Sequence, residues 1–185
     1  MIILNVFVKM FIRCIKMIII TGGSGLLGHA FKNIIPKAHD PTHKDLDLTN
    51  KEETQQYFSH YDTRSAASID AVIHLAGAGV GDKRWTKKYK AEILNSRLLG
   101  TTTIANAVAQ VKPKVFISAS AIGWYGETGN RAVVESDRGG DDFLAAVCRE
   151  WEAAADLAGD VRTVKLRTGL VLDPTGGALG RMLPL

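Results

Sequence analysis

The stretch TGGSGLLG, Thr21–Gly28, contains the residues whose types and spacing point most directly to chemistry. Gly23, Gly25 and Gly28 fit the pattern G-x-G-x-x-G, and Gly22, Gly25 and Gly28 also fit G-x-x-G-x-x-G. In such a loop one glycine permits a tight turn, another lets the backbone approach a pyrophosphate, and the last allows a helix to pack closely on a strand. A helix that follows presents free N–H groups and its positive dipole end to the phosphates. The loop therefore predicts dinucleotide binding, and it is not a Walker loop, because no Gly-Lys-Ser/Thr follows.

The elements around the loop must place it between a strand and a helix. Met17–Thr21 (MIIIT) is a short apolar, β-branched run that predicts a buried parallel strand, and Leu26–Ile35 has helical character up to Pro36. Further strands are predicted at Asp70–Leu75, Lys114–Ala119 and Val161–Leu166, very short ones at Ala38–Asp40 and Leu46–Leu48, and helices within Trp85–Val111 and over Asp141–Leu157. This alternation predicts an α/β fold, a Rossmann-type doubly wound parallel sheet with helices on both faces.

Composition and charge place the chain among ordinary globular domains. It has 185 residues, of which 46% are hydrophobic and 23% charged, and this is enough for one domain. The net charge is +4, but Lys9, Arg13 and Lys16 supply three of these charges, and residues 1–16 contain no acid. Because the basic excess is not spread over a binding face, we expect no nucleic-acid partner.

Residues 1–16 (MIILNVFVKMFIRCIK) are predicted to be an extension ahead of a domain at 17–185. Their apolar run is too short and too charged to span a bilayer, so no stable membrane insertion is expected. We favour a translated leader before a start at Met17, while a membrane-surface anchor stays open, because the three cations share one face of a potential helix. Cys14 and Cys148 suggest neither a disulfide framework nor a metal site, and they favour a reducing, cytoplasmic location.

Longer stretches of the chain resemble a known family. TGGSGLLG, DLDLTN and DAVIHLAG resemble the extended short-chain dehydrogenase/reductase superfamily, the nucleotide-sugar epimerases and dehydratases. From Gly81 onward, GDKRW, NSRLLGTTTI, ISASAIGWYG, DDFLAAVCREWE and LRTGLVLDPTGGAL resemble its atypical epimerase-like subfamily, of the SDR39U type. The resemblance covers residues 17–185, while the Pro36–Asn50 segment is more similar to a sugar-nucleotide reductase. Members continue into a C-terminal substrate-binding region, so the resemblance implies that this chain is the N-terminal, cofactor-binding portion.

The resemblance also assigns catalytic positions. In the superfamily a Tyr donates a proton, a Lys four residues later lowers its pKa, a Ser orients the substrate oxygen and an Asn supports the site. Here Leu144 stands at the Tyr position, Cys148 at the Lys position and Arg97 at the Asn position, while Ser120 is kept. The catalytic candidates are therefore Ser120, Arg97, Cys148 and Tyr125 in GWYG.

Several of these candidates have a second interpretation. Cys148 lies on an apolar helix stripe, where a thiol has a raised pKa, so we favour an inert or cofactor-packing role over a catalytic one. Tyr125 fits an alternative acid and a packed loop aromatic equally well. His74 is expected to be a hydrogen-bonded core histidine. The basic stretch Lys83–Lys90 is expected to be a solvated helix start near an anionic substrate rather than a nucleic-acid contact.

The glycine loop and the resemblance together predict a set of cofactor contacts. These are Thr21, Gly22, Gly23, Ser24, Gly25, Leu26, Leu27, Gly28, Asp47, Leu48, Leu75, Ala76 and Gly77. NADP is favoured over NAD, because no acidic residue clearly ends a second strand, whereas Lys37, His39, His43 and Lys44 could meet a 2′-phosphate. Asp40 and Asp45 favour NAD instead.

The expected activity is that of an NAD(P)-dependent oxidoreductase or epimerase-like enzyme that lacks the usual Tyr/Lys pair. The alternative is a dinucleotide-binding sensor or scaffold without turnover. The expected partner is a small-molecule substrate, with a sugar nucleotide as one candidate, and a homodimer is one candidate assembly. No metal is expected.

Overall fold

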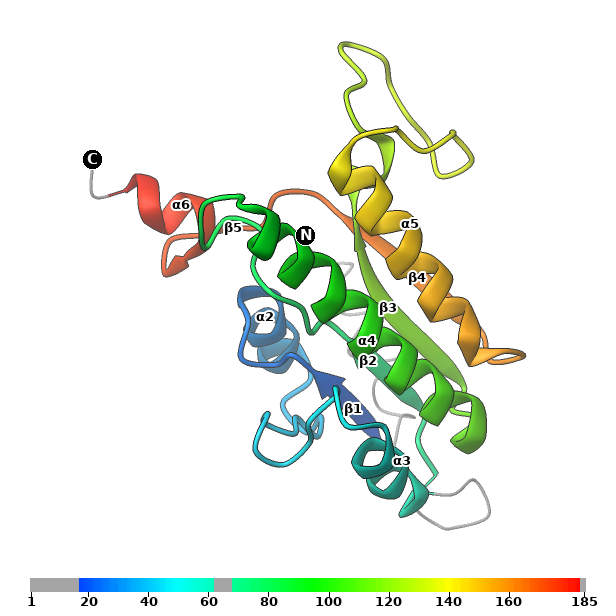
Figure 1. Ribbon diagram of the computed structural model, residues 1–185. Coiled ribbons are helices and arrows are strands. Elements are labelled where there is room, and N and C mark those ends of the chain that lie inside the picture. The colour runs from blue at the N-terminus through cyan, green and yellow to red at the C-terminus, as the bar shows by residue number, and fades with distance from the viewer. Residues whose placement is uncertain (1–16, 62–67, 184–185) are drawn as a thin grey trace, which may run out of the picture.

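The computed structural model describes residues 17–61 and 68–183, so the predicted extension at 1–16 lies outside the described residues. Four strands form one parallel sheet in the order β1-β2-β3-β4 (Figure 1). Their bounds are Ile18–Thr21 (β1), Ala71–His74 (β2), Val115–Ala121 (β3) and Thr163–Thr168 (β4). Each matches a predicted apolar strand to within a few residues at either end. The predicted α/β fold with a parallel sheet is confirmed.

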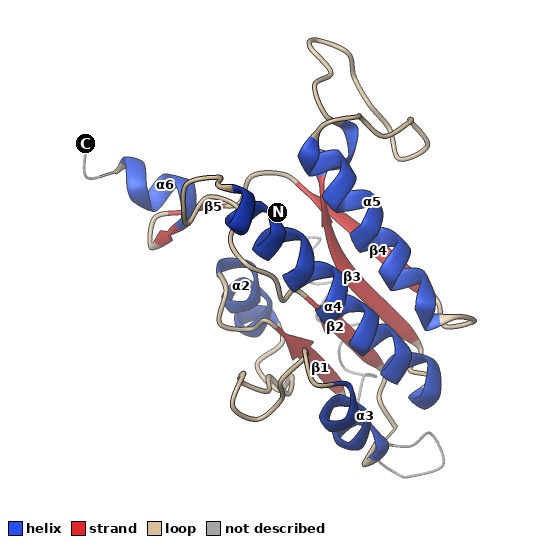
Figure 2. Ribbon diagram, viewed as in Figure 1, coloured by secondary structure: helices blue, strands red, loops and turns tan. Residues whose placement is uncertain are grey.

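Helices alternate with these strands. Their bounds are Leu26–Ile34 (α2), Lys51–Ser59 (α3), Lys87–Val111 (α4) and Phe143–Ala155 (α5), with 3-10 turns at Ile122–Tyr125 (η1) and Asp156–Ala158 (η2). Helices α4 and α5 lie across the same face of the sheet (Figure 2). The chain between Tyr125 and Asp142 forms a loop that projects beyond the start of α5 (Figure 1).

Alternating side chains along the strands separate two cores. Ile19, Val72 and Phe116 point to one face and are fully buried in a cluster with residues of α3 and α4 and the end of α5. Ile18 and Ile20 point to the other face and pack in a second cluster with partly buried residues of α2 and the loop that follows it. This period of two is the geometry of a strand buried on both sides. The predicted helical cover on both faces is therefore confirmed.

The sheet reverses its winding direction beside β1. His39 forms an isolated parallel bridge with Ile19, on the side of β1 away from β2. The chain thus passes from β1 through α2 to one side, and then through α3 to β2 on the other. Such a switch point opens a crevice at the carboxyl ends of the strands, and this is where ligands bind in doubly wound folds.

Two sequence expectations need correction in this region. The short second strand at Ala38–Asp40 is reduced to the single bridge at His39, and Leu46–Leu48 forms no strand. Leu46 is instead buried in the core, and the segment leads into α3. Helix α3 was not predicted, because its sequence KEETQQYFS is mostly polar; the Asn50 side chain caps it by accepting from the Glu53 N–H.

The end of the described chain also forms elements that the sequence analysis did not identify. These are β5 (Leu172–Asp173) and α6 (Gly177–Met182). Arg181 of α6 hydrogen-bonds to the backbone of Gly81 and pairs with Asp82 at 3.1 Å, which ties α6 to the loop after β2. Within 17–61 and 68–183, none of the helices has both the length and the apolar character needed to cross a membrane.

Candidate functional site

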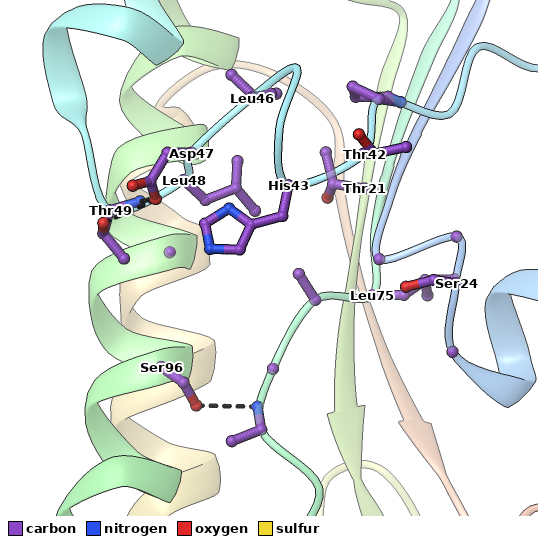
Figure 3. Close-up of a pocket in the computed structure, with 18 of the residues that line it drawn as sticks. Thr21, Ser24, Thr42, His43, Leu46, Asp47, Leu48, Thr49, Leu75 and Ser96 are labelled. Atoms are coloured by element: carbon purple, nitrogen blue, oxygen red, sulfur yellow. Dashed lines mark hydrogen bonds between the residues drawn. The ribbon is translucent and has the colours of Figure 1, made fainter.

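A pocket of about 660 Å³ opens at the carboxyl end of β1, at the switch point of the sheet. Its wall is built from the glycine loop, the segment between Asp40 and Thr49, the loop after β2 and one face of α4. Figure 3 shows His43 and Leu48 reaching into this space from one side, with Leu75 opposite. Glu92, Ser96 and Gly100 line it at intervals of one helical turn. We call it the glycine-loop pocket.

Gly22, Gly25 and Gly28 differ in how much space the structure leaves for a side chain. Gly22 has a φ of +80°, and a Cβ there would lie 2.6 Å from the backbone nitrogen of Ala76. A Cβ at Gly28 would lie 2.5 Å from the Gly22 carbonyl oxygen, so this glycine lets α2 pack against the loop. A Cβ at Gly25 would make only an ordinary contact, at 3.5 Å, with the same oxygen. The fold therefore needs Gly22 and Gly28, whereas Gly25 leaves open space beside the loop.

The N-terminus of α2 has no side-chain cap. Its N-cap residue is Gly25, and its first turn contains no acidic residue. Asn50, Thr86 and Asp142 do cap α3, α4 and α5, each by accepting a hydrogen bond from a backbone N–H of the first turn. The first N–H groups of α2 thus keep their capacity to bind an acceptor, and the helix dipole favours an anion there.

A buried hydrogen-bonded chain supports the floor of the pocket. The Nδ1 of His74 lies 2.7 Å from the Thr21 hydroxyl, and its Nε2 lies 3.0 Å from the Thr101 hydroxyl. His74 is fully buried, and burial lowers its pKa to about 4, so the ring is neutral at pH 7. This confirms the expectation of a core histidine and links β1, β2 and α4 directly below the glycine loop.

Helix α4 also fixes the loop that follows β2. The Ala78 N–H donates to the Ser96 hydroxyl at 3.1 Å (Figure 3), and the Ser96 hydroxyl donates to the Ile93 carbonyl. The next residue, Arg97, donates from Nη1 to the Ala78 carbonyl at 2.9 Å. Two consecutive side chains therefore hold both backbone groups of Ala78, and the wall of the pocket is rigid at this point.

Asp40 brings an acidic side chain to the rim of the pocket. It directly follows the bridged His39, and its Oδ2 pairs with the Lys32 ammonium at 2.7 Å. A Cβ added at Gly23 would collide with the Asp40 carboxylate, so the two residues are in close contact. The sequence analysis placed Asp40 at the end of a very short predicted strand and noted that it favours NAD; the structure reduces that strand to the single bridged residue before Asp40.

A second polar group, the β3–α5 cluster, consists of Ser120, Tyr125, Cys148, Glu152 and Arg167. The Ser120 hydroxyl donates to Glu152 Oε1 at 2.6 Å. Arg167 donates from Nε and Nη2 to the two Glu152 oxygens at 2.8 and 2.9 Å, and from Nη1 to the Tyr125 hydroxyl at 3.0 Å. Its guanidinium also lies over the Trp124 ring, 4.0 Å from the centroid. These bonds join β3, β4, α5 and η1.

Protonation states in the cluster follow from burial and from these bonds. Burial alone would raise the pKa of Glu152, but hydrogen bonds from Arg167 and Ser120 outweigh it and lower the pKa below its usual value. Burial raises the pKa of the Cys148 thiol, and the nearby Arg97 charge offsets this only in part. The Cys148 sulfur contacts the Ala121 carbonyl oxygen at 3.8 Å. Glu152 is therefore an anion and Cys148 a neutral thiol at pH 7.

The structure separates the predicted cofactor contacts from the predicted catalytic residues. The contacts that line the glycine-loop pocket are Thr21, Gly22, Gly23, Ser24, Gly25, Asp47, Leu48, Leu75, Ala76 and Gly77. Leu26, Leu27 and Gly28 lie in the first turn of α2, outside its lining. Ser120, Tyr125 and Cys148 lie in the β3–α5 cluster, and Arg97 is stacked on Trp151 of α5 at 4.8 Å from the ring centroid.

The family of this chain follows from its match to a known family model. The model of the NAD dependent epimerase/dehydratase family matches residues 18–143. The chain belongs to the NAD dependent epimerase/dehydratase family. Among its curated relatives, an epimerase family protein of Mycobacterium leprae is 38% identical over 176 residues, which are 90% of this chain and 56% of the relative. The epimerase family protein SDR39U1 of Homo sapiens is 31% identical over 176 residues, covering 90% of this chain and 58% of that protein.

Two solved structures show the same fold as this chain. The crystal structure of human SDR39U1 with NADPH matches with a TM-score of 0.75 and 28% identity, over 91% of this chain and 59% of that one. A dTDP-4-dehydrorhamnose reductase from Clostridium acetobutylicum, at 18% identity, matches with a TM-score of 0.76, over 91% of this chain and 59% of that one. The predicted resemblance is confirmed, and the chain spans a little over half the length of these relatives.

Sequence reasoning missed several residues of the site. Arg167 is absent from the predicted set, although it shares a strand face with Lys165 and a period of two places it under α5. Glu152 is likewise absent from the predicted set, because its pairing with Arg167 joins separate elements. Ser96 stands beside the predicted Arg97, but only the path of the loop after β2 reveals its contact with the Ala78 N–H.

Proposed function

We propose that this chain binds a nicotinamide dinucleotide in the glycine-loop pocket, with NADP(H) preferred over NAD(H). The observation that carries the proposal is the uncapped N-terminus of α2, which opens at Gly25 beside the pocket while the other three long helices are capped by side chains. Free N–H groups and a helix dipole at this position suit a pyrophosphate. The residues present therefore fit a dinucleotide.

The chain's own residues would divide the binding between them. The backbone from Gly22 to Gly25 would hold the pyrophosphate, and the open side of Gly25 leaves room for its close approach. Asp47 and Leu48 line the same pocket and would contact the adenine, as the resemblance implies. When bound, a dinucleotide supplies or accepts a hydride, and the rigid wall at Ala78 would orient its reactive part.

The preference for NADP(H) is supported by two observations. The human relative at 28% identity was solved with NADPH. At the pocket rim, the Lys32 ammonium already neutralises Asp40, and His43 projects into the same space (Figure 3). Asp40 opposes the preference, because an acid at this position suits the 2′-hydroxyl of NAD. We propose that the neutralised pair admits a 2′-phosphate.

For the whole protein we propose an oxidoreductase or epimerase-like reaction on a small molecule, with a sugar nucleotide as one candidate substrate. Ser120, Arg97, Tyr125 and Cys148 stay candidates for the chemistry. A cytoplasmic location and a homodimer also stay predictions.

One observation favours a second function, a dinucleotide-binding sensor or scaffold without turnover. The Ser120 hydroxyl donates a hydrogen bond to Glu152 at 2.6 Å, and the resemblance implies that Leu144 and Cys148 stand at the positions where the superfamily has Tyr and Lys. In this arrangement Ser120 is bonded to the protein rather than directed at a ligand.

Titration calorimetry on residues 1–185 tests the proposal, with NADPH and NADH as ligands. We expect saturable binding of both, with the lower Kd for NADPH. No binding of either would contradict the proposed function, and tighter NADH binding would contradict the preference. Hydride exchange in the full-length protein with a panel of sugar nucleotides then separates an enzyme from a sensor.

A further inference from the structure

We propose that Arg97 is the receptor for an anionic oxygen group, a carboxylate or a phosphate, on a small molecule bound beside the glycine-loop pocket. This names a chemical class for the second ligand of the site. It rests on the proposed function only in assigning the neighbouring pocket to a dinucleotide.

Arg97 is a buried cation. It stands on α4, and only 8% of the residue is exposed. Burial lowers the pKa of its guanidinium, but an arginine still carries its charge at neutral pH. A buried charge is costly unless an opposite charge or a full set of hydrogen bonds compensates it.

The described residues compensate this charge only in part. Nη1 donates to the carbonyl oxygens of Ala78 and Ile93, at 2.9 and 3.1 Å, and the guanidinium lies over the Trp151 ring. No carboxylate within 17–61 and 68–183 forms an ion pair with it. The titratable groups that act on the pKa of its guanidinium are Cys148, a neutral thiol, and Tyr89.

Arg167 shows what full compensation looks like in the same molecule. Its guanidinium forms a two-bond ion pair with Glu152 and further hydrogen bonds to Tyr125 and to the backbone of Glu135. Arg97 has no such partner, although it is the more buried of the two. The difference indicates that the partner of Arg97 comes from outside the described chain.

Two donors of Arg97 are left for that partner. Its Nε and Nη2 have no hydrogen-bond acceptor among the described residues. In the described part of the chain, the polar side-chain atoms that are both fully enclosed and without a hydrogen-bond partner are the Tyr57 hydroxyl oxygen and the Trp151 Nε1. The two Arg97 nitrogens are not among them. Both therefore keep some solvent-exposed surface, from which a ligand oxygen would approach. The planar pair of donors matches the two oxygens of a carboxylate or phosphate.

The position of Arg97 separates this anion from the pyrophosphate of a dinucleotide. A Cβ at Gly77 would lie 3.3 to 3.5 Å from three atoms of the Arg97 side chain, so Arg97 flanks the loop after β2. The uncapped N-terminus of α2 instead follows β1, on the other side of that loop. Arg97 faces Trp151 and Cys148 of α5, and it does not line the pocket.

The test uses inorganic phosphate and acetate as probes, with no dinucleotide present. The unfolding temperature of residues 1–185 is followed while each probe replaces chloride at constant ionic strength. We expect a saturable rise for the wild type with at least one probe. Arg97→Met should weaken the apparent affinity by about tenfold or more, because a charge-assisted pair is lost. Without a probe, the same variant should unfold at a temperature close to that of the wild type, because removing a partly compensated buried charge offsets the loss of its bonds to the Ala78 and Ile93 carbonyls.

Three further variants complete the design. Arg97→Lys should keep part of the response, and it still tests the proposal if Arg97→Met fails to fold. Arg162→Met removes the same charge from an exposed position at the start of β4, and it should respond as the wild type does. Gly25→Val blocks the glycine loop, and it too should respond as the wild type does.

The proposal is wrong if Arg97→Met keeps the response, or if the wild type shows none with either probe. It is also wrong if Gly25→Val removes the response, because the probe then binds at the N-terminus of α2. These outcomes are independent of the NADPH titration, so failure of this proposal and failure of the proposed function are distinguishable.

Discussion

The glycine-loop pocket and the β3–α5 cluster differ in whether their polar groups are already hydrogen-bonded within the protein. At the glycine-loop pocket, the N–H groups at the start of α2 have no side-chain acceptor, and Gly25 leaves open space beside them. In the β3–α5 cluster, Ser120 and Arg167 are both bonded to Glu152, and Arg167 is bonded to Tyr125. The first region is ready to bind a ligand without rearrangement, whereas the second is already occupied in joining four elements of the fold.

A residue's position in a family motif does not by itself fix its role. The resemblance implies that Ser120 stands where the superfamily orients a substrate oxygen, whereas in the structure its hydroxyl donates to the buried Glu152 carboxylate. Any catalytic use of Ser120 must first break a 2.6 Å hydrogen bond to an anion, and such bonds are stronger than those between neutral groups. Substitutions in the two regions should therefore have opposite signatures, on binding in one and on stability in the other.

The largest effect on stability is expected at Glu152. Replacing it with Gln leaves Arg167 without its counter-charge, and breaking a buried pair in this way costs about 3 kcal/mol or more. Chemical denaturation of Glu152→Gln should show this loss, while NADPH affinity of the folded protein changes little. Glu150→Gln, at an exposed position of the same helix, is the matched control and should be nearly neutral. If Glu152→Gln has the same free energy of unfolding as the wild type, the cluster does not have the structural role argued for it.

Acid should weaken the floor of the pocket through His74. The pKa of this buried ring is lowered to about 4, against 6.5 in the unfolded chain. The unfolded state therefore binds the extra proton between these values, so stability is full above pH 6.5 and falls as the pH drops toward 4. At about 1.4 kcal/mol for each pKa unit, the total loss of unfolding free energy is about 3.5 kcal/mol. Denaturation curves between pH 4 and 7 should show this slope in the wild type, and His74→Gln should lack it.

A smaller change is expected at the pocket rim. Asp40→Asn removes an acid near the proposed 2′-phosphate and releases the Lys32 ammonium from its 2.7 Å pair. Calorimetry should show the ratio of NADH to NADPH Kd rising by about tenfold, the size of one charge-assisted contact. An unchanged ratio would mean that the ribose binds elsewhere. Asp45→Asn is the control, because the Asp45 carboxylate bonds to Thr42 at an exposed site.

The smallest effect is expected at Cys148. General acid–base catalysis is worth about 10²–10⁴-fold in rate, but burial keeps this thiol protonated and a poor acid. Turnover of the full-length protein should therefore change by far less than that in Cys148→Ala, whereas Arg97→Ala should weaken it strongly, because it removes the proposed receptor of the anionic ligand. A thousandfold loss in Cys148→Ala, with the fold and NADPH binding intact, would make the thiol catalytic.

Hydrophobic periodicity and glycine spacing predicted the elements whose burial follows from their own sequence. Strand β1 and helix α5 could be predicted because the apolar residues of each repeat with the period of its own secondary structure. The glycines after β1 could be predicted from their spacing. Helix α3 was hidden, because it buries little apolar surface and depends on the cap at Asn50. The ion pairs Lys32–Asp40 and Glu152–Arg167 were hidden for another reason. Each joins residues of separate elements, and spacing along the chain does not encode such contacts.

The most direct test of the difference between the two regions is NADPH binding by two variants of residues 1–185. In Gly25→Val, a branched side chain fills the open space at the start of α2, where only the Gly22 carbonyl oxygen lies nearby, so the fold should survive. We predict that this variant loses NADPH binding by calorimetry while its circular dichroism is unchanged. Ser120→Ala should bind NADPH with a Kd close to that of the wild type. Normal binding by a folded Gly25→Val, or lost binding in a folded Ser120→Ala, would contradict the account.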